Sequence, residues 1–360
     1  MSRRTLQATI AHPPDAKDTS RDSSLTLTGR ASARRLPAWH DRCVPLHIET
    51  PLLESRPLSL ATGKSVWLKM DALQPSGSFK LRGLGLACET YHRNGARRFV
   101  CSSGGNAGLA VAYAGRLLGV KVVVVVPETT TGRAKALLAQ EGANVIVHGA
   151  SWQEANAMAT SLVGPDDAYL HPFDDPLLWP GHATLIDECA KSGLVPDAVV
   201  LSVGGGGLLC GIAEGIRRNG WTTTQIVAVE TDGAASLRAA IAAGRPVALE
   251  RIASVATSLG AKQVCDEAMR VVATYPVTSI VISDQAALAA CERFLADHRI
   301  LVEPSCGAAL AVVYDALPAL APFETVLVVV CGGATATLEQ IRAWSVQFQT
   351  VRAVPSPATK

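Results

Sequence analysis

The chain turns at Pro75-Ser-Gly-Ser-Phe-Lys80, between a strand-like run, 65–69, and an amphipathic run, 81–93. Serine and glycine are residues of turns and helix starts, so this stretch predicts Lys80 in the first turn of a helix. A helix start already carries partial positive charge, which disfavours a cation there. A lysine held at such a point shifts towards the neutral amine, the form that attacks a carbonyl group. A solvated surface lysine would also fit, so the role of Lys80 depends on the rest of the chain.

Short apolar strands and helical segments alternate along the sequence. The predicted strands are 65–69, 98–102, 121–126, 144–148, 198–202, 225–230, 279–282 and 325–330. The predicted helices are 81–93, 106–118, 131–140, 151–162, 208–219, 263–275, 284–297 and 335–345. Such alternation is typical of βαβ units, and the valine run 122–126 suits a strand that is buried on both faces. The predicted fold class is therefore α/β, with parallel sheets flanked by helices.

Periodicity is lost at 169–180, which we interpret as the point where the chain leaves one sheet and joins another. The sequence thus predicts a small inserted domain, 70–172, within a large domain built from 41–69 and 173–346. Residues 1–40 are rich in arginine, serine and proline and have no signal-peptide core, so we expect a disordered tail, with a targeting role left open. Residues 347–360 are expected to form a frayed C-terminal tail.

Composition excludes several classes of function. The 360 residues carry a formal net charge of +2, which suggests neither a nucleic-acid partner nor a membrane-surface partner. The apolar runs are strand-sized, well short of the roughly 20 residues that span a bilayer. The nine cysteines are scattered without a CxxC pair. This spacing argues against a disulfide framework or a zinc site and favours a reducing compartment, which we take to be the cytoplasm.

The first of three further glycine-containing turns is Ser102-Ser-Gly-Gly-Asn-Ala-Gly108, between a predicted strand and a predicted helix. Ligands of open parallel sheets bind at the carboxyl ends of strands. Backbone N–H groups and serine hydroxyls at a helix start are suited to a carboxylate. Asn106 is placed to hydrogen-bond a ring hydroxyl of a ligand. A tight turn with an asparagine cap is the alternative.

The second turn is Ser202-Val-Gly-Gly-Gly-Gly-Leu208, which again follows a predicted strand. Four consecutive glycines carry a large entropic cost, which is understandable if their amides close around an anion such as a phosphate. The turn lacks the lysine of a GxxxxGK[ST] loop and does not match the dinucleotide fingerprint well. A plain flexible turn also fits.

The third turn is Cys331-Gly-Gly-Ala-Thr335. Its thiol could face a ring nitrogen, or it could be a buried structural cysteine. Taken together, the turns describe a ligand with a monophosphate, a polar heteroaromatic ring and a carbonyl group for Lys80. Pyridoxal 5′-phosphate has these features, and Phe79 is placed to cover one face of its ring.

The motifs resemble those of the serine/threonine dehydratases among the fold-type II pyridoxal-phosphate enzymes, most of all the mammalian-type L-serine dehydratases and their serine dehydratase-like branch. The resemblance covers roughly Pro45 to Arg342. It rests on Leu-Lys-Met-Asp-Ala-Leu-Gln-Pro-Ser-Gly-Ser-Phe-Lys, Ser-Ser-Gly-Gly-Asn-Ala-Gly, Pro-Phe-Asp-Asp-Pro, Ser-Val-Gly-Gly-Gly-Gly-Leu-Leu-Cys-Gly, Val-Glu-Pro-Ser-Cys-Gly-Ala-Ala and Val-Cys-Gly-Gly. It implies a two-domain fold like that of the tryptophan synthase β chain, with the cofactor between the domains, and usually a homodimer.

The resemblance also implies roles for individual residues. Lys80 matches the Schiff-base lysine, and Phe79 the aromatic residue that stacks on the cofactor ring. The remaining cofactor positions are Asn106 for the ring hydroxyl, Gly204, Gly205, Gly206, Gly207 and Leu208 for the phosphate, and Cys331 for the ring nitrogen. The implied substrate-carboxylate positions are Ser103, Gly104, Asn106 and Ala107. The implied site for a monovalent cation, usually potassium, is Glu230, Ala234 and Leu259.

The implied activity is dehydration and deamination of L-serine, and of L-threonine, to a keto acid and ammonia. A β-replacement enzyme of the cysteine synthase type and a catalytically weak cofactor-binding paralogue are the alternatives. The sequence departs from the resemblance at two points. Gly104 stands where close relatives often have alanine, and glycine at this position resembles the less active serine dehydratase-like branch. Ala334-Thr335 stands where the relatives tend to have Ser-Asn.

Overall fold

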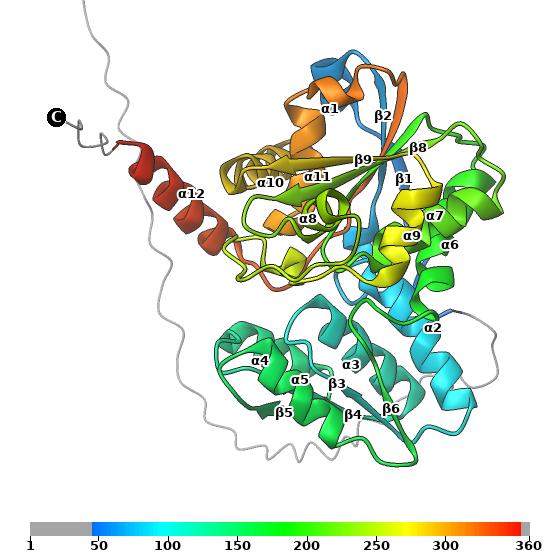
Figure 1. Ribbon diagram of the computed structural model, residues 1–360, viewed down its shortest axis with the longest axis vertical. Coiled ribbons are helices and arrows are strands. Elements are labelled where there is room, and N and C mark those ends of the chain that lie inside the picture. Colours follow the sequence, from blue (N-terminus) through cyan, green and yellow to red (C-terminus); the bar gives the residue numbers. More distant parts are fainter. Residues whose placement is uncertain (1–44, 354–360) are drawn as a thin grey trace, which may run out of the picture. The chain divides into compact units, whose positions relative to one another are not determined.

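The structure, a computed structural model, describes residues 45–353. The tail predicted for residues 1–40 and the last seven residues lie outside this range. Two β-sheets organise the described residues, and Figure 1 shows helices on both faces of the larger one.

The larger sheet has six strands in the order β1-β2-β10-β7-β8-β9. They are β1 (Leu52–Glu54), β2 (Ser65–Lys69), β7 (Ala198–Ser202), β8 (Gln225–Thr231), β9 (Val277–Ile282) and β10 (Thr325–Val329). Every neighbouring pair is parallel except β1 and β2, which are antiparallel. The parallel sheet is thus confirmed, with an antiparallel edge strand that the sequence pattern did not predict.

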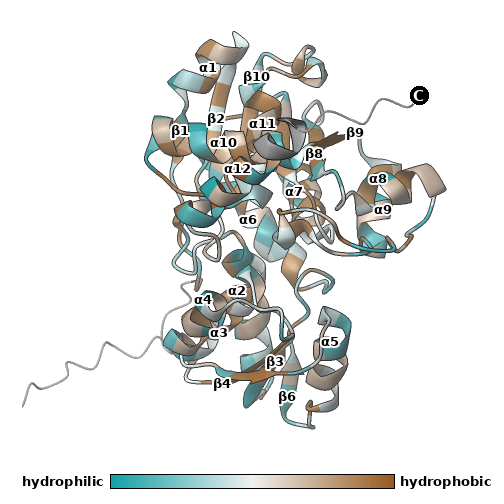
Figure 2. Ribbon diagram, turned by 90° about the vertical axis from the view of Figure 1, so that its left-hand side faces the viewer, coloured by the Kyte–Doolittle hydropathy of each residue, from teal (hydrophilic) through white to brown (hydrophobic). Residues whose placement is uncertain are grey.

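The smaller sheet has four parallel strands in the order β5-β4-β3-β6. They are β3 (Arg98–Cys101), β4 (Lys121–Val126), β5 (Asn144–Val147) and β6 (Asp167–Tyr169). Val124, Val125 and Val126 in β4 are fully buried, because helices cover both faces of this sheet. Figure 2 shows the hydrophobic colour along this strand.

The helices are α1 (Arg56–Thr62), α2 (Lys80–Arg93), α3 (Asn106–Leu118), α4 (Gly132–Gln140), α5 (Trp152–Ser161), α6 (Leu178–Lys191), α7 (Gly207–Arg218), α8 (Ser236–Ala243), α9 (Asp266–Thr274), α10 (Asp284–His298), α11 (Pro304–Tyr314) and α12 (Leu338–Ala353). Seven of the eight predicted helices are confirmed within a few residues. The eighth, α12, starts at Leu338 and continues to Ala353, past the predicted end at residue 345 and into the segment expected to be frayed. Helices α1, α6, α8 and α11 were not predicted. No helix of the described residues is long and apolar enough to cross a membrane.

The two sheets belong to one compact unit of the chain, so the domain boundaries near residues 70 and 172 stay a prediction. Helix α2 connects the two sheets. Its apolar side chains, including Leu81, Leu84 and Cys88, join the core of the smaller sheet. The guanidinium of Arg82 is instead directed towards β2 and α6 of the larger one.

Arg82 is the centre of a buried network of charges. Its guanidinium donates to Asp71, with Nε–Oδ2 at 2.7 Å and Nη2–Oδ1 at 2.9 Å. It also donates to Glu188, with Nη1–Oε1 at 2.5 Å and Nη2–Oε2 at 2.8 Å. Lys69, the last residue of β2, lies 2.5 Å from the same carboxylate. Burial alone would raise the pKa of Glu188, but hydrogen bonds from Arg82 and Lys69 hold it below its usual value.

The network balances two positive and two negative side chains, all nearly or fully inaccessible to solvent. A buried ion pair adds little net stability compared with an apolar replacement, but removal of one partner leaves an uncompensated charge. The network therefore fixes β2, the turn after it and the start of α2 in one arrangement.

We predict that Glu188→Ala lowers the free energy of unfolding by about 3–5 kcal/mol, because Arg82 and Lys69 then lack their shared acceptor. Urea unfolding of the purified protein measures this. The control is Glu141→Ala, which breaks the partly exposed pair with Arg116 and should cost about 0–1 kcal/mol. Equal losses in the two variants would contradict the assignment.

Candidate active site

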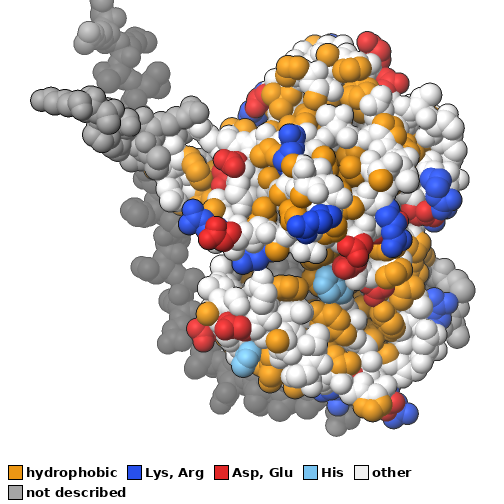
Figure 3. All heavy atoms as spheres, in the orientation of Figure 1, with side chains coloured by type: hydrophobic (Ala, Val, Ile, Leu, Met, Phe, Trp, Pro, Cys, Tyr) orange, Lys and Arg blue, Asp and Glu red, His pale blue; other side chains and the backbone are white. Residues whose placement is uncertain are grey.

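A cavity of about 940 Å³ opens where residues from both sheets meet. Figure 3 shows the surface hollowed at this level, with charges of both signs scattered over this face. The predicted site residues that line the cavity are Phe79, Lys80, Ser103, Gly104, Asn106, Ala107, Gly204, Gly205, Gly206, Gly207, Leu208, Leu259 and Cys331. Glu230 and Ala234 do not line it. The structure thus brings together the three glycine-containing turns and the lysine.

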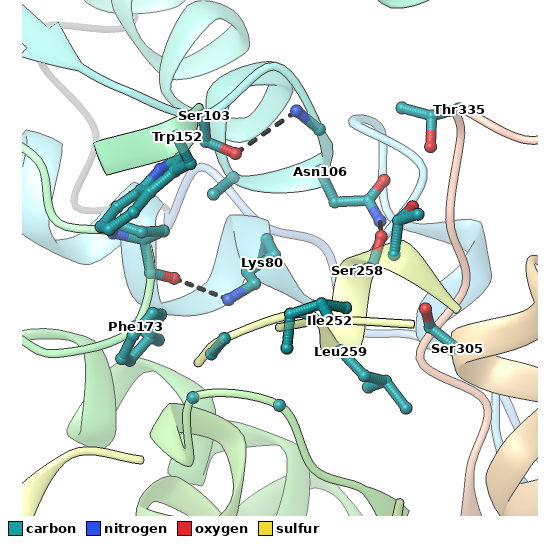
Figure 4. Close-up of a pocket in the computed structure, with 18 of the residues that line it drawn as sticks. Lys80, Ser103, Asn106, Trp152, Phe173, Ile252, Ser258, Leu259, Ser305 and Thr335 are labelled. Atoms are coloured by element: carbon teal, nitrogen blue, oxygen red, sulfur yellow. Dashed lines mark hydrogen bonds between the residues drawn. The ribbon is translucent and has the colours of Figure 1, made fainter. Parts of the chain in front are cut away.

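Lys80 is the first residue of α2, which confirms its predicted place in the first turn. The residue before the helix is Phe79, and no serine side chain caps it, contrary to the turn chemistry expected from the sequence. Lys80 Nζ donates to the carbonyl oxygen of Pro172 at 2.6 Å (Figure 4). Burial lowers the pKa of Lys80 to about 8. About a tenth of the Lys80 amine is therefore neutral at pH 7, far more than for a lysine in water.

Phe79 separates the cavity from a buried histidine. Its ring centroid lies 5.0 Å from that of His182, with the rings tilted by 54°. His182 is fully buried, and burial holds its pKa well below the usual value, so the ring is neutral. A Cβ at Gly83 would collide with this imidazole, and a Cβ at Gly211 would collide with the Cβ of His182. The closely packed His182 therefore fixes the position of Phe79 on the side that faces away from the cavity.

The four glycines of the second turn lie directly against other segments. Gly206 has a φ of 95°, which disfavours any residue with a side chain. A Cβ on Gly205 would fall 2.2 Å from the ring of Phe173, and one on Gly204 would fall 3.0 Å from Leu259 Cα. Helix α7 begins at Gly207, so its first N–H groups, which have no partner within the helix, belong to this turn. Close packing is thus a second reason for the glycines, besides the predicted anion site.

Asn106 has both ends of its amide engaged. Its Oδ1 accepts from the N–H of Ala334 at 3.1 Å, and its Nδ2 donates to Glu303 Oε1 at 2.6 Å. Figure 4 also shows the contact of Nδ2 with Ser258 Oγ. Glu303 is buried, and burial raises its pKa above the usual value. This carboxyl group determines which way the Asn106 amide is turned.

The predicted substrate loop lies at the start of α3. Ser103 Oγ accepts from the N–H of Gly105 at 3.3 Å, and Ala107 is buried in the first turn. Gly104 faces Thr130: a methyl group at 104 would lie 2.7 Å from Thr130 Cγ2 and 3.3 Å from Val126 Cγ1. The space that alanine would fill at this position is thus partly occupied by the threonine.

Cys331 lies in the segment that follows β10, on the opposite side of the site. The neighbouring thiol of Cys306, together with burial, raises the pKa of Cys331 well above the usual range. The thiol is therefore neutral. The backbone carbonyl of Cys331 accepts from the N–H of Phe79 at 3.1 Å, which connects this turn directly to the Lys80 turn.

Of the predicted cation residues, Leu259 lines the cavity and Glu230 and Ala234 do not. Glu230 is buried and accepts from the N–H groups of Leu237 and Arg238 at 2.7 and 2.8 Å, at the start of α8. Burial raises its pKa to about 7. Leu259 packs on Gly204 instead. The described residues contain no cluster of three or more histidine, cysteine, aspartate or glutamate side chains suited to a metal, so a cation here would depend on backbone carbonyl oxygens.

The donor set fits pyridoxal 5′-phosphate. The site offers an amine of lowered pKa, an amide, a helix start with four glycines, and a neutral thiol. Two further hydroxyls, those of Ser78 and Ser305, line the cavity and are buried, without a hydrogen-bond partner among the described residues. Unpaired buried hydroxyls are costly, and a polar ligand would satisfy them.

Comparison with known proteins agrees with this chemistry. The sequence profile of the family described as "Pyridoxal-phosphate dependent enzyme" matches residues 44–332. The chain belongs to this family.

The relatives of this pyridoxal-phosphate enzyme include the L-serine dehydratase/L-threonine deaminase of Homo sapiens, 46% identical over 322 residues that cover 86% of this chain and 98% of that protein. The serine dehydratase-like protein of Mus musculus is 46% identical over 314 residues, which cover 84% and 95%. Among solved structures, a fungal L-serine ammonia-lyase from Rhizomucor miehei matches with a TM-score of 0.80 and 35% identity, over 85% of this chain and all of that one.

Sequence reasoning missed several residues of the site. Glu303 was part of a quoted motif but had no role, although the Glu-Pro pair is a helix-start signal that could have placed it at the cavity. Pro172 contributes its backbone carbonyl group, and a backbone contact leaves no signal in the pattern of side chains. Thr130 lies in a loop of the smaller sheet, and only the fold brings it beside Gly104.

The lowered pKa of Lys80 predicts a pH dependence in the apoprotein. Burial favours the neutral amine, so the reactive fraction rises with pH and levels off above about 8. We expect the rate of acetylation at Lys80, followed by mass spectrometry from about pH 6 to about pH 10, to level off in this way. The exposed Lys121 of the same chain is the reference. Parallel profiles for the two lysines would contradict the prediction.

Proposed function

We propose that this enzyme is an L-serine ammonia-lyase that also acts on L-threonine, and that it releases ammonia and pyruvate or 2-oxobutanoate. The observation that carries the proposal is the partly neutral Lys80 amine, which lies in one cavity with the glycine turn, Asn106 and Cys331. The names of the relatives, which include serine dehydratases and a serine ammonia-lyase, support the same substrate class.

Lys80 holds the cofactor through its amine and later handles the substrate proton. When bound, pyridoxal phosphate supplies an electron sink for the substrate α-carbon. Phe79 would hold the ring face of this cofactor, Asn106 its ring hydroxyl, Gly204 to Leu208 its phosphate, and Cys331 its ring nitrogen. The lysine amine, released when the substrate binds, accepts the α-proton; its lowered pKa suits a general base near neutral pH.

The substrate carboxylate is assigned to the loop of Ser103, Gly104, Asn106 and Ala107. The support is local: Ser103 and Gly104 lie at the N-terminus of α3, where free N–H groups and positive partial charge favour an anion. Loss of the α-proton and of the β-hydroxyl forms a carbon–carbon double bond, and water then releases ammonia and leaves the keto acid. Because the Cys331 thiol is neutral, it does not hold the ring nitrogen protonated, which favours elimination over transamination.

A monovalent cation, potassium, is assigned to Glu230, Ala234 and Leu259. The supporting observation is the buried Glu230 carboxyl, whose raised pKa would fall if a cation lay beside it. A homodimer and a cytoplasmic location stay predictions. The eight described cysteines are all free, as expected in a reducing compartment; Cys43 lies outside the described residues.

The activity is tested with purified protein and L-serine, L-threonine or D-serine, each in potassium and in sodium salt, with the keto acid measured. We expect keto acid from the two L-amino acids, more in potassium. Lys80→Ala should abolish it together with the yellow colour of the bound cofactor, whereas the exposed Lys121→Ala should change neither. A yellow protein that forms no keto acid from any substrate would rule out the dehydratase and leave the replacement enzyme or the weak paralogue.

The substrate loop predicts a gain of function. Alanine at position 104 restores a methyl group beside the substrate, and better positioning raises the rate. Thr130 is part-exposed on a loop, so its side chain can move to admit the methyl group. We expect Gly104→Ala to raise kcat on L-serine, by about tenfold at most.

The double variant Gly104→Ala, Thr130→Ser removes the atom closest to the new methyl group and should be at least as active as the single variant. Steady-state kinetics on all three proteins decide this. A fall in kcat for both variants, with cofactor binding unchanged, would show that Gly104 is not the limiting contact.

A further inference from the structure

The start of helix α11 forms part of the cavity wall. Pro304 and Ser305, its first two residues, both line the cavity. Figure 4 draws Ser305 with its side chain turned out from the start of this helix. Only 3% of the residue is exposed to solvent, and its hydroxyl has no hydrogen-bond partner among the described residues. None of the roles assigned above uses this side chain.

An unpaired buried hydroxyl is unfavourable, because it has lost its water partners and gained none in the protein. Such a group is expected to meet a ligand atom. The positive end of the helix dipole also lies at this first turn, although the N–H groups of Cys306 and Gly307 already donate to the carbonyl oxygen of Glu303. This end of the helix therefore favours an acceptor atom with a lone pair and disfavours a protonated nitrogen.

The neighbouring thiol is less able to serve such an acceptor. The Cys331 thiol interacts with that of Cys306, the residue that follows Ser305 in the helix, and this interaction raises the pKa of Cys331. A thiol is also a weak donor compared with a hydroxyl. Between the two groups, Ser305 is the stronger donor and the one that is not engaged.

We propose that the Ser305 hydroxyl donates a hydrogen bond to the pyridine nitrogen of the cofactor, beside Cys331. This inference rests on the proposed function, because it requires pyridoxal phosphate in the cavity. In this arrangement, both α11 and the segment after β10 contribute a residue that contacts the ring nitrogen. A neutral donor at a positive helix end leaves the nitrogen unprotonated, in agreement with elimination as the main reaction.

The test compares Ser305→Ala with the wild type in two measurements that do not depend on turnover. The dissociation constant for pyridoxal phosphate is measured by fluorescence titration of the apoprotein, and the melting temperature of the apoprotein by calorimetry. We expect binding about three- to tenfold weaker, the effect of one lost hydrogen bond. The melting temperature of the apoprotein should not fall, because alanine removes a hydroxyl that has no partner there.

Ser78→Ala is the matched control. Ser78 is equally buried, lines the same cavity and also has an unpaired hydroxyl, but it does not belong to the α11 helix start. We expect it to bind the cofactor more tightly than Ser305→Ala does. Ser305→Cys keeps a weaker donor of similar size and should lie between the wild type and Ser305→Ala; it also replaces the alanine variant if that variant does not fold.

The outcomes separate the possibilities. Unchanged affinity in Ser305→Ala overturns the inference, and so does a weaker affinity accompanied by a lower melting temperature of the apoprotein, which indicates a purely structural role. Loss of affinity in Ser78→Ala alone assigns the contact to Ser78 and also overturns it. A wild-type protein that binds no pyridoxal phosphate contradicts the proposed function itself.

Discussion

The buried guanidinium of Arg82 is the constraint on which the rest of the site depends. It lies two residues after Lys80 and binds carboxylates from the turn after β2 and from α6, so the helix that carries the lysine is fixed at its first turn. Because removal of any partner would leave a charge without compensation, the network has one favourable arrangement. The lysine can therefore lie in a half-buried position that a mobile helix start would not maintain.

Near the lysine, burial keeps several titratable side chains in their neutral forms. Burial keeps His182 neutral behind Phe79, and the Cys331 thiol is neutral through burial and its contact with Cys306. The amide of Asn106 is oriented by Glu303, whose own pKa is raised. In such surroundings the amine of Lys80 loses its proton more easily than it would in water, because desolvation disfavours the charged form. The N-terminal ends of α2, α3, α7 and α11 supply further polar groups to the cavity.

Much of the architecture follows from the sequence, because alternating apolar strands and amphipathic helices leave a clear periodic signal. The exceptions have physical causes. Helix α11 is buried all round, so it has no polar face to produce a period. Helix α6 contains Pro180 in its first turn. Proline is tolerated there, but in the sequence pattern it indicates an interruption of a helix. The site was predictable where glycine turns follow strands, and the Glu-Pro helix start could have indicated Glu303. Pro172 and Thr130 were not predictable, because they reach the cavity through a backbone carbonyl group and through tertiary packing.

Two consecutive residues connect the two ends of the site. Pro172 contacts Lys80, and Phe173 contacts Gly205. One dipeptide presents a carbonyl oxygen to the amine and an aromatic ring to the glycine turn. When the amine forms a covalent bond, this carbonyl group loses its donor, and the adjacent ring already bears on the backbone of the glycine turn. A side chain introduced at residue 205 would thus also displace the carbonyl group that faces the nitrogen of residue 80, although the two residues are 125 positions apart in the chain.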